Sequence, residues 1–140
     1  MKNVLTQSTK ASEMVRSWYK IDAKGKVLGR VAVEIAKKLI GKSKTYFVKN
    51  LDCGDYVVVI NAKHFVVTGH KDVEKMYTRY SGYPGGLKSK PLWLVKKDKP
   101  QEVIRRAVMG MLPKNKLRNR MITRLYVYPD SEHPYESKFI

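Results

Sequence analysis

A five-residue apolar run in the middle of the chain constrains the fold more than any other feature. Residues Tyr56–Ile60 are Tyr-Val-Val-Val-Ile, and Asn61 follows at once. The run is rich in β-branched residues and lacks the apolar–polar alternation of a strand with one solvated face. It therefore predicts a strand covered on both faces, as in a parallel or mixed sheet sandwiched by helices. A second short apolar run, residues 65–68, ends at Gly69.

The segment before this run has the pattern of a strand followed by a helix. Trp18–Asp22 resembles a first strand, and residues 23–26 resemble the turn after it. In residues 28–40 apolar side chains recur at helical spacing, charged side chains occupy the other face, and Gly41 is suited to end the helix. Strand, helix and buried strand form a βαβ unit, which predicts an α/β fold.

A strand, a loop and a helix are predicted in the second half. Met76–Tyr80 resembles a strand, and the glycine-rich residues 81–90 resemble a loop. Asp98 is placed to cap a helix that has Pro100 in its first turn and that ends at Pro113.

The rest of the chain completes a single domain. Residues 114–124 allow one or two more helical turns, and residues 125–128 resemble a last strand. No internal repeat or inter-domain linker is evident. We therefore expect one α/β domain over residues 18–129, between an N-terminal arm (1–17) and a C-terminal tail (130–140).

The chain is strongly basic. Its 140 residues include 29 Lys and Arg but 12 Asp and Glu, which gives a net charge of +17 at pH 7. A molecule of this charge repels itself, and its natural partner is a polyanion. Between Val103 and Pro129 there is no acidic residue, whereas solvated surfaces usually mix both signs. Nucleic acid is thus the leading partner, and an acidic membrane surface is a distant second.

Cysteine content and hydropathy limit the cellular compartments in which we expect the protein. Cys53 is the only cysteine, which excludes an intramolecular disulfide and a cysteine-rich zinc site and fits a reducing environment. No apolar run approaches the roughly 18 residues that span a bilayer. The N-terminal segment also lacks the apolar core of a secretory signal. We expect a protein of the cytoplasm or of an organelle.

The glycine loop is the first candidate for contact with nucleic acid. Its glycines match neither a dinucleotide-binding fingerprint nor a P-loop, and alone they are most simply a turn. Their basic and aromatic neighbours favour RNA, because tyrosines stack on unpaired bases and cations meet phosphates. These neighbours are Arg79, Tyr80, Tyr83, Lys88 and Lys90.

The densest cationic cluster lies in residues 114–124. Charge runs are usually solvated helix faces, but no acidic residue compensates this one, which favours a phosphate-binding surface. Its members are Lys114, Lys116, Arg118, Arg120 and Arg124. Further candidates lie on predicted helix faces, at helix ends and in basic stretches: Lys37, Lys38, Lys42, Lys44, Lys49, His70, Arg105 and Arg106.

Catalytic and metal-binding patterns are weak. Asp52 and Asp55 flank Cys53, but they are more simply turn formers before the strand. The three histidines have neither metal-ligand spacing nor clustered acids. We expect no enzymatic activity, no cofactor and no metal. The alternatives are an RNA-modifying or nucleotide-using enzyme, suggested by the βαβ start, and an architectural DNA-binding protein.

Five short motifs stand in register over most of the chain. They are Leu28-Gly29-Arg30; the strand that begins Gly54-Asp55-Tyr56 and ends Ile60-Asn61-Ala62; Val67-Thr68-Gly69; Gly82-Tyr83-Pro84-Gly85-Gly86; and Gly110-Met111-Leu112-Pro113-Lys114. In this order they resemble the L-thirteen family of ribosomal large-subunit proteins, most closely its bacterial and organellar branch. The resemblance covers roughly residues 18–134.

This resemblance implies a three-layer α/β/α domain around a small, mostly parallel sheet, with basic loops and extended terminal arms. It implies a structural constituent of the large subunit that binds large-subunit rRNA and supports early assembly and translation, without enzymatic activity. The implied partners are this rRNA and neighbouring large-subunit proteins, with the protein a monomer within a cytoplasmic or organellar ribosome and no membrane or small-molecule substrate.

By position in the motifs, Arg30, the loop at 82–88 and residues 114–124 are expected to face RNA. The chain departs from the family near its end. Relatives commonly have a His-Pro-His sequence and a longer glutamine-containing tail, whereas here Glu132-His133-Pro134-Tyr135 leads to Ile140.

Overall fold

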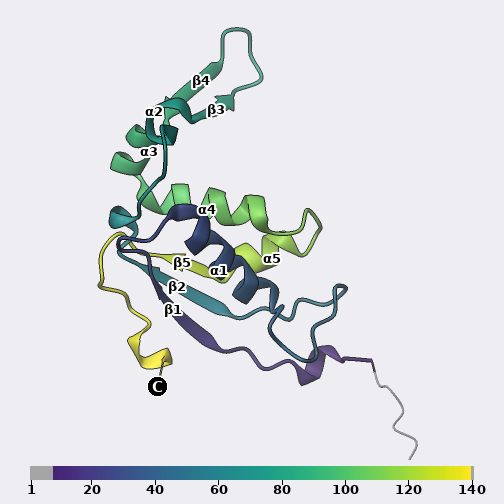
Figure 1. The fold of residues 1–140 in the computed structure, drawn as a ribbon. Coiled ribbons are helices and arrows are strands. Elements are labelled where there is room, and N and C mark those ends of the chain that lie inside the picture. The colour runs from purple at the N-terminus through teal and green to yellow at the C-terminus, as the bar shows by residue number, and fades with distance from the viewer. Residues whose placement is uncertain (1–7, 140) are drawn as a thin grey trace, which may run out of the picture.

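The computed structural model describes residues 8–139, and a three-stranded sheet lies at its centre (Figure 1). The strands are β1 (Trp18–Asp22), β2 (Tyr56–Ile60) and β5 (Leu125–Val127). Their order is β1-β2-β5, and both pairs are parallel. The bounds predicted for the first two strands are confirmed, and the last strand ends one residue earlier than expected.

Three helices pack on one face of this sheet: α1 (Leu28–Ile40), α4 (Pro100–Met111) and α5 (Arg118–Thr123). Because side chains alternate along a strand, Ile21, Val57 and Leu125 point to this face. There they join the apolar sides of the helices in one buried core. At the end of α1, Gly41 adopts the left-handed conformation (φ 78°), and its N–H donates to carbonyls of the last helical turn. The predicted helix and its glycine stop are confirmed.

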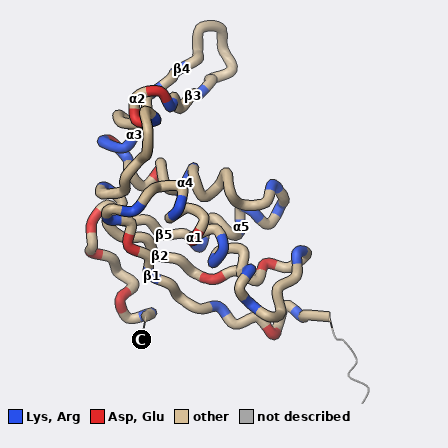
Figure 2. The backbone as a smooth tube through the Cα atoms, in the orientation of Figure 1, with Lys and Arg blue, Asp and Glu red and all other residues tan. Residues whose placement is uncertain are grey.

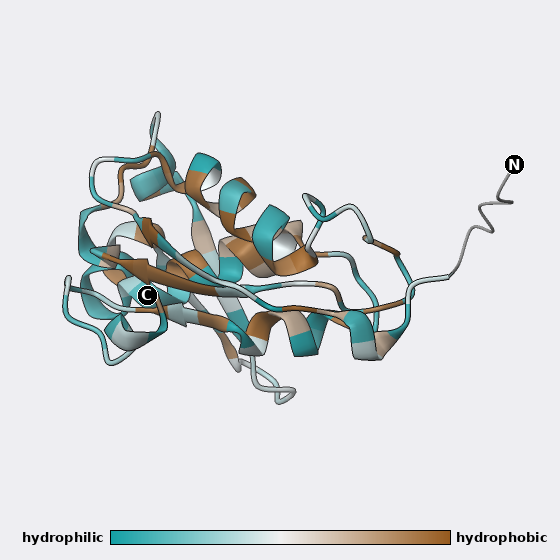
Figure 3. Ribbon diagram, turned by 90° about the horizontal axis from the view of Figure 1, so that it is seen from below, coloured by the Kyte–Doolittle hydropathy of each residue, from teal (hydrophilic) through white to brown (hydrophobic). Residues whose placement is uncertain are grey.

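The C-terminal segment covers the opposite face of the sheet, and it includes the short 3₁₀ helix η3 (Glu136–Lys138). Trp18 on β1 stacks on Tyr56 of β2, with ring centroids 4.4 Å apart, and on Tyr135 of the segment, with centroids 5.1 Å apart. Val58 beneath them is fully buried. The run at 56–60 is therefore covered on both faces, as predicted (Figure 3).

The molecule thus has three layers: the helices, the parallel sheet, and the C-terminal segment with its 3₁₀ helix. The predicted α/β domain with a small, mostly parallel sheet is confirmed. Both large helices lie on the same face because β2 and β5 are each added on the same side of the preceding strand, and right-handed crossovers then place their helices together.

A second sheet, which is antiparallel and two-stranded, projects from the main body (Figure 1). Its strands are β3 (Met76–Tyr80) and β4 (Leu87–Pro91), which lie between α2 (Lys71–Glu74) and α3 (Leu92–Asp98). The predicted strand at 76–80 is confirmed. The loop predicted for residues 81–90 is wrong after residue 86, because residues 87–90 pair with β3, with Lys88 opposite Arg79. Local composition carries no signal for that pairing.

The start of α4 also differs from the prediction. Asp98 does not cap it, because Asp98 is the last residue of α3, a helix that the sequence pattern did not indicate. Lys99 occupies the N-cap position and makes no side-chain capping bond. The apolar residues 65–68 follow the 3₁₀ helix η2 (Ala62–His64) and contribute one isolated bridge, between Val66 and Val27.

Residues 8–17 run beside the connection between α1 and β2 and contain the 3₁₀ turn η1 (Ala11–Glu13). The Thr9 hydroxyl donates to the Tyr46 carbonyl at 3.1 Å, and the Ser17 N–H donates to the Asp55 carboxylate at 2.9 Å. Residues 1–7 of the predicted arm and the last residue of the predicted tail lie outside the described residues. Between residues 8 and 139, no helix combines the length and apolarity that a membrane crossing requires.

Candidate nucleic-acid interface

Most basic side chains in the described part of the chain have no acidic partner. Among residues 8–139, the basic residues that form an ion pair within 4.0 Å are Arg16, Lys44, Lys63, Arg106 and Arg124. Figure 2 shows Lys and Arg along the projecting hairpin, on α3 and around the ends of α1 and α4. Uncompensated cations over several elements form the electrostatic footprint expected of a polyanion-binding surface.

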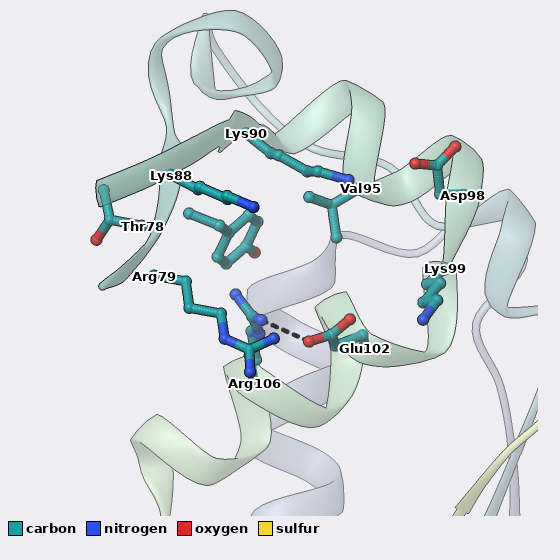
Figure 4. Close-up of a pocket in the computed structure, with 10 residues that line it drawn as sticks. Thr78, Arg79, Lys88, Lys90, Val95, Asp98, Lys99, Glu102 and Arg106 are labelled. Carbon is teal, nitrogen blue, oxygen red and sulfur yellow. Dashed lines mark hydrogen bonds and ion pairs between the residues drawn. The ribbon is translucent and has the colours of Figure 1, made fainter. Parts of the chain in front are cut away.

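The first cluster lines a hollow of about 260 Å³ between the hairpin and α4. Arg79 and Lys88 are cross-strand partners, and Lys90 faces Tyr77 two pairs further along, so all three cations share one face of the hairpin. Arg106 comes from α4 on the other side of the hollow (Figure 4). Cations from the hairpin strands and from α4, which are distant from each other in the sequence, therefore lie around one concave site.

Arg106 is held in place by two neighbours. Its guanidinium donates to the Glu102 carboxylate at 2.5 Å, one helical turn away, and lies 5.0 Å from the centroid of the Tyr77 ring. Burial raises the pKa of Tyr77, so this ring is a neutral wall of the hollow over the whole physiological range. The arrangement orients the guanidinium of Arg106 toward the hairpin cations.

The turn at the hairpin tip exposes its aromatic side chain. Gly82 (φ 88°) and Gly85 (φ 72°) adopt left-handed conformations, and the Gly86 N–H donates to the Tyr83 carbonyl at 3.0 Å. The glycines are thus required by the turn itself. Tyr83 is 76% exposed, which leaves its ring free to stack. Tyr80 is also exposed, but strand alternation places it on the opposite face from Arg79.

The second cluster joins the segment before α5 to the connection after α1. Lys114, Lys116 and Arg120 are exposed, and Arg118 is half-buried. The Asn115 side-chain oxygen accepts from the Arg118 N–H at 3.1 Å, which shapes the start of α5. The structure brings two further predicted residues close to this segment, because a groove of about 390 Å³ is lined by Lys42 and Lys49 together with Pro113 and Asn115.

The remaining predicted residues are dispersed over the surface. Arg30 is exposed in the first turn of α1, and Lys37 is exposed in the last turn. The ammonium group of Lys38 lies 4.0 Å from the centroid of the Tyr19 ring. His70 is exposed before α2, and Arg105 is exposed on α4, where its guanidinium donates to the Leu125 carbonyl at 3.3 Å.

Two predicted residues point into the protein instead of toward a partner. Arg124 is 6% exposed and donates to the Asp52 carboxylate and to the Leu39 carbonyl. Lys44 pairs with the buried carboxylate of Asp55 at 2.5 Å. Burial lowers the pKa of Lys44, but its hydrogen bonds, chiefly with Asp55, outweigh burial and raise that pKa overall. Neither side chain belongs to the exposed cationic surface.

The carboxylates of Asp52 and Asp55 therefore neutralise cations that point into the protein, Arg124 and Lys44. Cys53 between them is buried against the core, 1% exposed. No group of three or more potential metal-ligating side chains occurs within residues 8–139.

Sequence reasoning missed three lysines that line the hollows. Lys99 lines the hairpin hollow, and Lys75 lines a neighbouring groove of about 380 Å³ with Lys71 and Arg106. The ammonium group of Lys75 lies 5.5 Å from the centroid of the Tyr77 ring. Strand alternation was the available signal, since residue 75 directly precedes β3 and has the same parity as residues 77 and 79.

Comparisons with known proteins agree with this basic surface. The family described as Ribosomal protein L13 matches residues 16–134. The chain is 51% identical over 133 residues to the large ribosomal subunit protein uL13 of Dehalococcoides mccartyi strain BAV1, covering 95% of this chain and 93% of the relative. It is 50% identical to the uL13 protein of Aquifex aeolicus, covering 95% and 92%, and 48% identical to that of Syntrophus aciditrophicus, covering 95% and 94%.

Proposed function

The chain belongs to the ribosomal protein L13 family, and on that basis we propose that it is a structural constituent of the large ribosomal subunit. There it binds large-subunit rRNA and supports early assembly and translation. Its role is structural, and its partners are the rRNA and other proteins of the particle. It acts as a single copy in a cytoplasmic or organellar ribosome.

The observation that carries the rRNA contact is the exposed, unpaired cationic cluster before and within α5. Within residues 8–139, Lys114, Lys116 and Arg120 form no ion pair. Lys42 and Lys49 line a groove together with Pro113 and Asn115 of the same segment. When such cations bind to phosphates, they displace the counterions condensed there and so release them. Placed where two rRNA segments approach, they lower the repulsion that opposes compact folding of the RNA.

Recognition is expected to depend on the backbone and shape of the RNA, because the narrow major groove of A-form RNA hides its base edges. We propose as contacts the exposed or half-buried cations of both clusters, of α1, of the connection after α1 and of α4, together with the histidine before α2 and the two hairpin tyrosines. They are Arg30, Lys37, Lys38, Lys42, Lys49, His70, Arg79, Tyr80, Tyr83, Lys88, Lys90, Arg105, Arg106, Lys114, Lys116, Arg118 and Arg120.

The proposal is tested by filter binding of the full-length protein to full-length large-subunit rRNA at several salt concentrations. In one variant Lys114, Lys116, Arg118 and Arg120 are all changed to Gln. We expect its affinity to fall by more than tenfold and the salt dependence, the slope of log K against log salt, to decrease by about 3.

A charge-matched control changes four exposed lysines outside the proposed contacts to Gln: Lys10, Lys20, Lys24 and Lys26. It loses the same net charge but is expected to lose less than threefold in affinity, since only the long-range field changes. Equal losses in the two variants would contradict a localised interface. Preference for duplex DNA over rRNA at matched salt would contradict the proposed function itself.

A further inference from the structure

The cations of the projecting hairpin are confined to one of its two faces. Arg79, Lys88 and Lys90 share the face that looks toward α4. The other face, which we call the outer face, carries only uncharged side chains. They are Met76, Thr78, Tyr80, Leu87, Ser89 and Pro91.

Solubility does not explain this separation, because solvent reaches both faces. On the outer face Tyr80 is 62% exposed and Leu87 is 64% exposed. Cations that served only to keep the hairpin soluble could equally lie on the outer face, where they would also cover apolar surface. Placing like charges on one face instead creates electrostatic repulsion, since Arg79 and Lys88 are directly opposite each other. Binding of an anionic ligand to the inner face would offset that repulsion.

The inner face opens on the hollow of about 260 Å³ whose opposite side is α4 (Figure 4). Five cations line this hollow, Arg79, Lys88, Lys90, Lys99 and Arg106, against the two carboxylates Asp98 and Glu102. Glu102 is already paired with Arg106, and no ion pair neutralises Arg79, Lys88 or Lys90 among the described residues. The hollow therefore holds an excess of positive charge in a concave site, where a single anionic group meets several donors at once.

We propose that this hollow is a discrete binding site for a backbone phosphate of RNA, a proposal that rests on rRNA being the partner. The phosphate oxygens accept hydrogen bonds from Lys88 and Lys90 on β4 and from the guanidinium of Arg79 on β3. Arg106, oriented by Glu102 and Tyr77, closes the site from α4. The hairpin and α4 thus act as two sides of a clamp on one RNA strand, and affinity depends on which face of the hairpin carries the cations.

A charge-conserving exchange tests this dependence. Lys88→Ser combined with Ser89→Lys keeps composition and net charge but moves one cation from the inner face to the outer face. In filter binding to full-length large-subunit rRNA, we expect the affinity to fall about tenfold and the slope of log K against log salt to decrease by about 0.7–0.9. A net-charge effect alone predicts no change.

The second exchange, Lys90→Ser with Ser89→Lys, makes the same move from the other lysine of β4, because Lys90 lines the hollow and Ser89 does not. It tests the proposal if the first variant folds poorly, as judged by circular dichroism and thermal midpoint. Loss of affinity in a folded exchange variant supports the phosphate site. Wild-type affinity in a folded exchange variant overturns the site and leaves the proposed function intact. Failure of the wild-type protein to bind rRNA overturns the proposed function, and the site with it.

Discussion

Arg124 shows at the scale of one residue how a basic run can contain a structural cation. It follows four other arginine and lysine positions that are exposed or half-buried, yet its own guanidinium is buried at the end of α5. It donates to the Asp52 carboxylate and to the carbonyls of Leu39 and Asp55, and so connects α5 to both ends of the α1–β2 connection. A charge in this position stabilises the domain and is not available to RNA.

Arg124→Ala is expected to lower the free energy of unfolding by roughly 3–5 kcal/mol, because it leaves the nearly buried Asp52 with only its longer ion pair to Arg16, at 3.7 Å. Urea denaturation of the isolated protein measures the change. Arg120→Ala, one turn earlier and exposed, is the matched control. It should change stability by less than about 0.5 kcal/mol while weakening rRNA binding. If the two variants showed the reverse pattern, the assignment of the two arginines would be wrong.

At the scale of elements, the end of α1 and the segment that leads into β2 approach each other closely. Gly54 lies against the backbone of Leu39, so that a Cβ atom there would stand 1.6 Å from the Leu39 carbonyl oxygen and 2.7 Å from a guanidinium nitrogen of Arg124. The backbone cannot shift away without disturbing both elements. A glycine is required at this position for packing, independently of its φ angle.

Gly54→Ala should therefore destabilise the protein by at least about 3 kcal/mol, at the upper end of overpacking effects. Gly110→Ala is the control, because a Cβ atom at residue 110, inside α4, meets no atom within 4 Å. That substitution should stabilise the protein by about 0.5–1 kcal/mol through helix propensity. Thermal or urea unfolding measures both changes, and a neutral Gly54→Ala would refute the packing argument.

At the scale of the whole molecule, the net charge of +17 acts in opposite directions on folding and on binding. Self-repulsion among unpaired cations destabilises the free protein, whereas the same cations provide the attraction to RNA. Salt screens both interactions over a Debye length of about 8–10 Å at physiological ionic strength.

We therefore expect added KCl, from about 50 to 300 mM, to raise the thermal midpoint of the isolated protein while it lowers its affinity for rRNA. The variant in which Lys114, Lys116, Arg118 and Arg120 are changed to Gln serves as the control. It should show a smaller rise in midpoint, because less repulsion remains to be screened. A midpoint that fell with salt in the wild-type protein would mean that attractive ion pairs outweigh the repulsion.

Elements with a strong local pattern were predictable from the sequence. Trp18–Asp22, Leu28–Ile40 and Tyr56–Ile60 were predicted with the bounds that the structure has, because β-branched runs, helical periodicity and a glycine stop are local signals. α3 and β4 were missed because each depends on a partner: β4 on its pairing with β3, and α3 on packing against α2 and α4. The candidate interface was predictable as a set of basic segments, but not residue by residue.

By itself the sequence determined the α/β class, the strand buried on both faces and the excess of positive charge, since composition and periodicity are properties of short segments. Only the tertiary structure decided which cations are exposed and which face they share. Arg124 is buried because Asp52, which is 72 positions earlier in the sequence, lies beside it. Arg79 meets Arg106 only because the hairpin stands over α4. Burial and convergence of charges depend on contacts between distant segments, which no local pattern encodes.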